Sequence, residues 1–147
     1  MKQALVASLM LLGSVSSLSA ADYMWNKEPG ETWQNWADPA NWLVAGETAT
    51  AAPGAEDTVK QPIATSGSTW CWDLGGGGYT VGAFVKRIDD SYIDTYCFQD
   101  GVLSFEKVEL PRKSRFVVGP DAKVTIKEGR FGENWASNMK EWGEVVV

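Results

Sequence analysis

Apolar residues recur at a fixed interval along the middle of this chain, and this interval restricts the fold more than any other feature. The recurring positions, 21 residues apart, are Phe84, Phe105 and Ile126 on one line and Leu103 and Val124 on a second, with Ile63 one step earlier. Around them apolar residues alternate with polar ones, as in strands with one buried face. A column of this kind is typical of the stacked coils of a solenoid. The spacing therefore predicts parallel strands piled in register.

Glycine and proline interrupt the chain so often that helices of ordinary length have no room to form. The sequence holds 15 glycines and 6 prolines, and both residue types end regular structure. Short β-prone runs lie between the breaks, at residues 58–59, 79–85, 102–110, 115–118 and 122–127. The pattern predicts an all-β domain. A β-sandwich of antiparallel strands is the alternative to the solenoid.

Residues 1–20 have the pattern of an export signal. Lys2 supplies the positive charge, residues 4–12 are apolar, and small residues lead to a cleavage site after Ala20 or Ala21. The apolar run is shorter than the roughly 20 residues that span a bilayer, and no second run follows it. We expect an exported protein, extracellular or at the cell surface, or periplasmic if retained. The mature chain is not expected to insert into a membrane.

The charge balance and the absence of histidine restrict the function. The chain has 13 basic and 19 acidic residues, for a net charge of −6. Nucleic acids are not expected partners, because binding them requires basic residues that neutralise phosphates. There is no histidine, which excludes Ser-His-Asp and Cys-His catalysis and histidine-ligated zinc. We expect no enzymatic activity and no cofactor.

Tryptophan is concentrated near the start of the mature chain, in the segment WQNWADPANW at residues 33–42. The open end of a strand stack must be covered, and each indole ring can bury on the order of 150 to 250 Å² there. Asp38 and Asn41 are expected to hold turns between the rings. Asp57 is expected where the chain enters the first coil. The predicted structural cap consists of Trp33, Trp36, Asp38, Asn41, Trp42 and Asp57, with Trp25 beside it.

Two motifs in this region resemble a known kind of protein. WADPANW (36–42) and PGAEDTV (53–59) are similar to the opening of long bacterial exported β-solenoid proteins, including autotransporter passenger-like and adhesin-like chains. Their opening follows a WxDxxNW and PxxxDxV pattern behind the signal peptide. TVGAF (80–84) and DGVLSF (100–105) resemble their rung strands. The resemblance covers roughly residues 25–127 and implies a right-handed parallel β-helix at the cell surface, in most relatives without demonstrated chemistry.

The same resemblance suggests how the chain is divided. Together with the patterns above, it divides the chain into a signal peptide (1–20), a tryptophan-rich cap (21–60), β-solenoid coils (61–130) and a tail or the start of a truncated coil (131–147). Relatives of this kind are much longer. We therefore expect this chain to be a fragment of a longer protein.

Two further groups of residues are candidate sites. Trp70 and Trp72 flank Cys71 in a strand-like run, so their rings share one face. If that face is exposed, they can stack on sugars; if it is buried, they belong to the core. Cys71 and Cys97, 26 residues apart, could form one disulfide between neighbouring coils, the alternative being two buried thiols.

Carboxylates are the remaining groups with catalytic or metal-binding potential. Asp89, Asp90, Asp94 and Asp100 could serve glycoside hydrolysis or bind Ca²⁺. The segment IDDSYID (88–94) lacks the EF-hand spacing, so we interpret these acids as polar loop residues. Lys86 and Arg87 are interpreted as part of a solvated surface.

Three functions are consistent with these features. The first is a non-catalytic exported structural protein, the cap and first coils of an adhesin-like β-solenoid. The second is a carbohydrate-binding module that uses exposed tryptophans. The third is a polysaccharide-degrading β-helix enzyme. Expected partners are glycans or cell-surface components, together with self-association through an open solenoid end.

Overall fold

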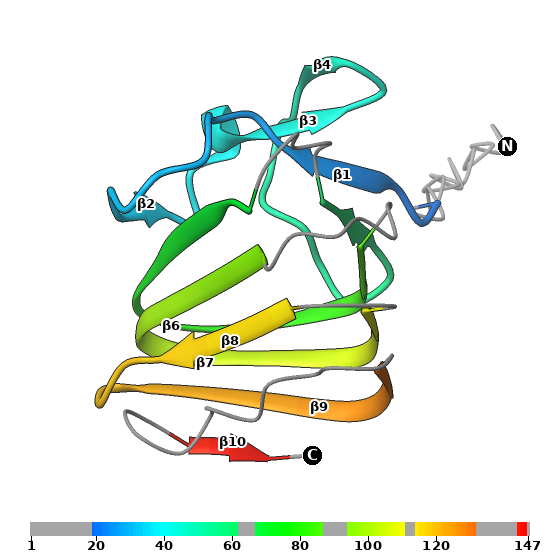
Figure 1. The fold of residues 1–147 in the computed structure, drawn as a ribbon. Coiled ribbons are helices and arrows are strands. Elements are labelled where there is room, and N and C mark those ends of the chain that lie inside the picture. The colour runs from blue at the N-terminus through cyan, green and yellow to red at the C-terminus, as the bar shows by residue number, and fades with distance from the viewer. Residues whose placement is uncertain (1–18, 62–66, 87–93, 111–113, 132–143, 147) are drawn as a thin grey trace, which may run out of the picture.

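The protein is all-β. A computed structural model describes residues 19–61, 67–86, 94–110, 114–131 and 144–146 (Figure 1). These residues form one 10-stranded open sheet and a 3-10 turn, η1 (Pro39–Asn41). The strands are β1 (Asp22–Trp25), β2 (Gln34–Asn35), β3 (Trp42–Val44), β4 (Glu47–Thr48), β5 (Thr58–Lys60), β6 (Thr69–Val85), β7 (Asp94–Leu110), β8 (Ser114–Val118), β9 (Ala122–Phe131) and β10 (Glu144–Val146). Most of the predicted signal peptide and Ile63 lie outside the described residues.

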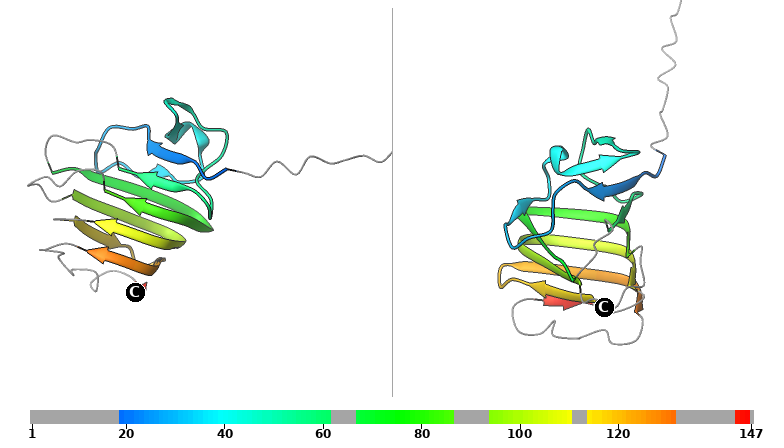
Figure 2. Two further views of the ribbon diagram at one scale, coloured as in Figure 1. Left: turned by 90° about the vertical axis from the view of Figure 1, so that its right-hand side faces the viewer. Right: turned by 45° about the horizontal axis from the view of Figure 1, so that its top comes forward.

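The sheet is mixed, and its parallel part is the larger. Strands β5, β6, β7, β9 and β10 pair in parallel one after another, and β8 is parallel to β7. At the other end β1 is parallel to β5 but antiparallel to β3, which is antiparallel to β4. Figures 1 and 2 show β6, β7 and β9 as bent layers on top of one another, with β1, β3 and β4 at one end. The five predicted β-prone runs all lie within these strands.

The predicted register is right for one pair of layers and wrong for the next. Phe105 lies opposite Ile126, as the 21-residue interval predicts, and the second column is likewise in register. Phe84, however, lies opposite Val108 and not Phe105. The two coils differ in length because eight residues (86–93) separate β6 from β7, whereas three (111–113) separate β7 from β8. A register shift within β6, between Asp73 and Gly77, further changes the offset from 26 residues (Cys71 to Cys97) to 24 (Phe84 to Val108). The coil length is therefore not constant along the chain.

The register shift falls at a sharp corner built from glycine. Gly75 and Gly76 have φ angles of 57° and 70°, in the left-handed region that glycine adopts without steric cost. Gly101 of the next layer lies directly under this corner. A Cβ atom there would come within 2.6 Å of the Gly77 carbonyl oxygen. Glycine at both levels therefore lets two layers turn the same corner in contact.

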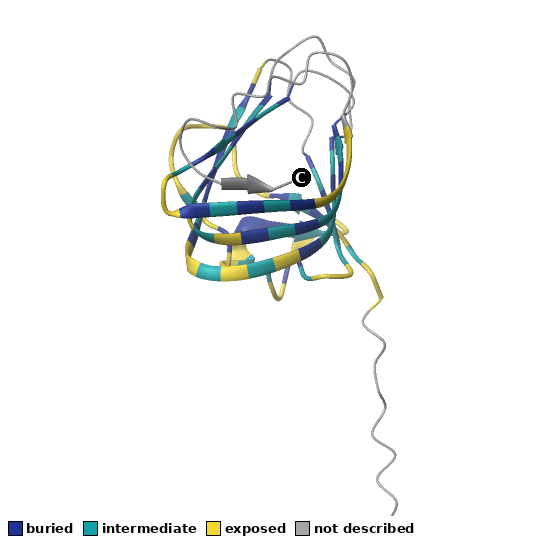
Figure 3. Ribbon diagram, turned by 90° about the horizontal axis from the view of Figure 1, so that it is seen from below, coloured by how far each residue is buried: buried dark blue, intermediate teal, exposed yellow. Residues whose placement is uncertain are grey.

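The core lies inside the bent layers and is mainly aromatic. Figure 3, seen from the β10 side, shows buried residues alternating with partly exposed ones along the strands. The ring of Phe84 lies 5.6 Å from Phe105 and 5.0 Å from Tyr96 between centroids. Apolar side chains from different layers thus meet even where their backbones are out of the predicted register. The other large buried rings of the parallel layers are Trp70, Trp72, Phe98 and Phe116.

Candidate functional site

Tryptophan rings cover the core at the end of the sheet formed by β1 and β3. Trp36 and Trp42 are 0 % exposed. The Trp42 ring lies 4.7 Å from Trp25 and 4.8 Å from Trp36, and both pairs meet edge to face. Trp25 and Trp36 in turn pack edge to face on Trp72 of β6, at 5.7 Å and 5.6 Å. This aromatic cap, defined as Trp25, Trp36 and Trp42, joins the antiparallel end to the parallel layers, in a geometry that stabilises aromatic pairs.

Short polar contacts fix the backbone that carries the aromatic cap. The Trp42 indole N–H donates to the Trp36 carbonyl oxygen at 2.8 Å. The Asn41 side-chain amide donates to the Asn35 carbonyl oxygen, also at 2.8 Å. Asp38 caps the turn η1, accepting the Ala40 backbone N–H at 2.9 Å. The predicted turn roles of Asp38 and Asn41 are confirmed.

Asp57 joins two segments of the chain that meet at the first parallel layer. Its Oδ1 accepts the Ala21 backbone N–H at 2.9 Å, and its Oδ2 accepts the Gly54 N–H at 2.8 Å. The Asp57 carbonyl oxygen approaches β6 so closely that a Cβ on Gly82 would lie 2.8 Å from it. Burial, and then the charge of Asp57, raises the pKa of nearby Tyr23. Asp57 thus holds the loop before β5 against β6, which fits its predicted position at the entry to the first coil.

Trp33 does not belong to the aromatic cap, which corrects the prediction from sequence. Its side chain is 42 % exposed, whereas that of Trp36 is fully buried. Trp33 directly precedes β2, where Gln34 lies opposite Trp72 of β6. Side chains alternate between faces along an extended strand. Trp33 therefore faces outward, while Trp36 turns inward.

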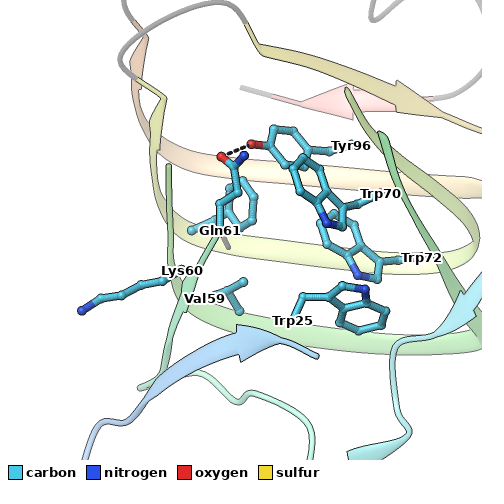
Figure 4. Close-up of a pocket in the computed structure, with 8 residues that line it drawn as sticks. Trp25, Val59, Lys60, Gln61, Trp70, Trp72 and Tyr96 are labelled. Atoms are coloured by element: carbon cyan, nitrogen blue, oxygen red, sulfur yellow. Dashed lines mark hydrogen bonds between the residues drawn. The ribbon is translucent and has the colours of Figure 1, made fainter. Parts of the chain in front are cut away.

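Trp70 and Trp72 are core residues, and the hypothesis that they are displayed for stacking on sugars is wrong. Each is 2 % exposed, and both stack on Tyr96, with interplanar angles of 14° and 2°. Figure 4 shows the two rings on one side of a small cavity, with Gln61 on the other. The cavity volume of about 10 Å³ matches a single water molecule. A sugar ring does not fit there.

A larger depression lies on the outer surface beside β1. Its volume is about 380 Å³, and it is open to solvent. The residues that line it are Asp22, Met24, Leu43, Ala45, Gly46 and Lys60. Asp22 and Lys60 form an ion pair across β1 and β5. No aromatic ring lines this depression, so it offers no platform for stacking.

Sequence reasoning missed a buried ionic cluster. Lys86 Nζ lies 2.7 Å from Asp94 Oδ2, and the two side chains are 1 % and 0 % exposed. Asp94 also accepts the Ser68 backbone N–H at 3.1 Å and the Gln61 side-chain amide at 3.0 Å. Tyr96 donates its hydroxyl to Gln61 at 2.5 Å. The interpretation of Lys86 and Asp94 as solvated loop residues is therefore wrong.

The position of this cluster explains why the carboxylate is buried. Gln61 follows β5, Lys86 follows β6, and Asp94 begins β7. The Asp94 carboxylate at the start of β7 thus receives donors from the two preceding layers, which satisfies it away from water. A lysine and an aspartate that each end or begin a strand are a weak sequence signal for such a pair. Gln61 and Ser68 lie 33 and 26 residues before Asp94, so the pattern alone could not join them to it.

The other candidate carboxylates are not gathered into a site. Asp100 is exposed at a tight bend, with a φ angle of 52°. Asp89 and Asp90 lie outside the described residues. Within the described ranges no three or more His, Cys, Asp or Glu side chains are grouped in a way that could hold a metal ion.

Cys71 and Cys97 lie opposite each other on β6 and β7. The predicted neighbourhood is confirmed, but both residues are free thiols in the structure. Burial raises the pKa of both thiols. The pKa of Cys97 reaches about 12, because burial is reinforced by the neighbouring Cys71 and the carboxylate of Glu31. The thiols are therefore protonated at neutral pH.

Comparisons with protein families, with curated proteins and with solved structures gave no match. Among the described residues, no helix is long and apolar enough to cross a membrane.

Proposed function

We propose that this chain is a non-catalytic exported structural protein, the N-terminal cap and first coils of a right-handed parallel β-solenoid. The observation that carries the proposal is the aromatic cap lying over a run of parallel layers. Trp36 and Trp42 are fully buried at the end where the parallel pairing stops. A solenoid needs such a cover, because its first coil has no preceding coil to pack against.

The parallel layers support the solenoid over the sandwich. Strands β5, β6, β7 and β9 follow one another both in the chain and in the sheet, except for the short β8. In a sandwich built from hairpins, such neighbours would be antiparallel. The layers also turn a common glycine corner, as successive coils of a solenoid do. The antiparallel part is confined to β1, β3 and β4.

The interior supports a structural role over catalysis. Asp94, the buried candidate carboxylate, is paired with Lys86 and accepts two further hydrogen bonds. The cavity beside Trp70 has room for about one water molecule. A surface location, as part of a longer adhesin-like protein, is the role that the motifs at 36–42 and 53–59 suggest.

Surface location can be tested by expressing the full chain with a C-terminal epitope tag in a bacterium that exports proteins. We expect the mass of the isolated protein to show cleavage after Ala20 or Ala21. We also expect protease added to intact cells to remove the tag, while a cytoplasmic marker stays intact. Retention of the uncleaved chain in the cytoplasm would refute export and the proposed role with it.

Glycan binding is a second candidate function, and the exposure of Trp33 favours it. This ring is 42 % exposed, and a flat exposed indole can stack on a sugar face. The polar pair Asp73 and Gln99, joined at 3.0 Å, lies on the neighbouring layers. A glycan array should then give signals that Trp33→Ala abolishes and Trp33→Phe retains in part. Signals that are equal for wild type and Trp33→Ala would exclude Trp33 as the platform.

A further inference from the structure

The cysteine pair has a position that suits a covalent link between two layers. Cys71 and Cys97 are direct partners in a parallel pair of strands. Neighbouring strands are about 4.8 Å apart, within the range of about 4.4 to 6.8 Å between Cα atoms that a disulfide tolerates. Because they occupy paired positions, a bond between them requires no displacement of the two strands.

The two thiols differ in access and in acidity, and these differences oppose each other. Cys71 is buried and Cys97 is partly exposed. Burial, and then the neighbouring Cys71, raises the pKa of Cys97 to about 12. Burial also raises the pKa of Cys71, but the neighbouring Cys97 thiol lowers it in part. The accessible thiol is thus the less acidic one, and the more acidic thiol is covered. Because the thiolate is the reacting species, the folded reduced protein should be a poor substrate for oxidation.

We propose that Cys71 and Cys97 are a disulfide site that links layers β6 and β7, and that the bond forms by thiol–disulfide exchange while the chain folds. In the first step the Cys97 thiolate attacks an external disulfide, giving a mixed disulfide and one released thiolate. In the second step Cys71 attacks the Cys97 sulfur and expels the second thiolate. The external disulfide takes up the two electrons, and its thiolates take up the two protons.

The experiment compares two ways of adding the same oxidant, oxidised glutathione, to the reduced mature protein. In one arm the protein is unfolded in urea and diluted into buffer with oxidised and reduced glutathione at pH 8. In the other arm the folded protein receives the same mixture. Intact mass, peptide mapping and thermal unfolding are then measured in both arms. Single variants Cys71→Ser and Cys97→Ser serve as controls.

The refolded arm should lose about 2 Da, map to a Cys71–Cys97 bond and melt on the order of 10 °C above the reduced protein. In the folded arm, oxidation should be at least about 30-fold slower than in the refolded arm. The raised pKa of Cys97 makes its thiolate more nucleophilic but much rarer, and the loss of thiolate has the larger effect. Each single variant should gain one glutathione and no internal bond. Two glutathiones on the refolded chain, or a linked form that melts lower, would overturn the site. Equal rates in the two arms would overturn its formation during folding.

Discussion

Replacing Trp36 by alanine tests the aromatic cap most directly. The side chain is fully buried and its ring meets Trp42, Trp72 and Tyr79 at 4.8, 5.6 and 6.3 Å. Removing a buried tryptophan costs about 3 to 5 kcal/mol. Its indole N–H is buried with no hydrogen-bond partner, so its loss returns part of the roughly 1 to 3 kcal/mol that such a group costs. We therefore expect Trp36→Ala to lower the free energy of unfolding by an amount near the lower limit, about 3 kcal/mol.

The same segment provides the matched control. Trp33→Ala removes the same side chain three positions earlier, where it is largely exposed, and should change stability by less than about 1 kcal/mol. Trp36→Phe keeps an aromatic ring and has no unpartnered N–H, so it should lower the free energy of unfolding clearly less than Trp36→Ala does. Urea unfolding followed by far-ultraviolet circular dichroism gives the three values. The reasoning is refuted if Trp36→Ala unfolds like wild type, or if Trp33→Ala is equally destabilised.

Three further predictions concern the contacts between layers. Asp57→Ala loses the bonds from Ala21 and Gly54 and should cost about 2 kcal/mol in urea unfolding, against about 1 for Asp38→Ala, which loses one capping bond. Lys86→Met leaves Asp94 buried without its cation and should cost about 3 to 5 kcal/mol, whereas Lys107→Met breaks an exposed pair and should cost less than about 1. Equal losses for the two lysine variants would contradict the burial argument. The pKa of the Cys97 thiol is 9.0 when unfolded and about 12 when folded, chiefly because of burial, so the folded state holds more protons between these values. The stabilisation that the folded protein gains from this thiol is therefore complete below pH 9, and it is lost as the pH rises to 12. The free energy of unfolding, measured at pH 8, 9 and 10, should decline less steeply with pH for Cys97→Ala than for wild type. Equal declines in the two proteins would contradict the raised pKa.

The strand runs of the parallel layers β5 to β9 could be predicted because they show local alternation, and the recurring apolar column indicated their parallel direction. The short strands β1 to β4, with their antiparallel pairing, and β10 were not predicted. The 21-residue offset between β7 and β9 was predictable as well, since Phe105 lies opposite Ile126. The 24-residue offset from Phe84 to Val108 could not be predicted, because it depends on the longer connection between β6 and β7 (86–93). A period read from three positions assumes equal coils, and nothing in the alternation reveals an unequal one.

The candidate site was predicted where a motif fixes local geometry and missed where the tertiary fold decides. Asp38 and Asn41 act through residues at most six positions away, so their turn roles were visible in the sequence. Trp33 and Trp36 stand in the same motif, yet only the pairing of β2 with β6 decides which ring is buried. The Lys86–Asp94 pair depends on donors 26 and 33 residues before Asp94. Spacing along the chain holds no trace of those contacts.

The reversal of strand direction at β1 has a consequence for assembly. Beyond β1 the described sheet ends in β4, two exposed residues, Glu47 and Thr48. So short and polar an edge offers few backbone groups for another chain to pair with. If copies of this protein do join through sheet edges, growth is blocked on the β4 side and must proceed from the opposite side. The aromatic cap and its antiparallel strands would then give any such assembly a fixed polarity.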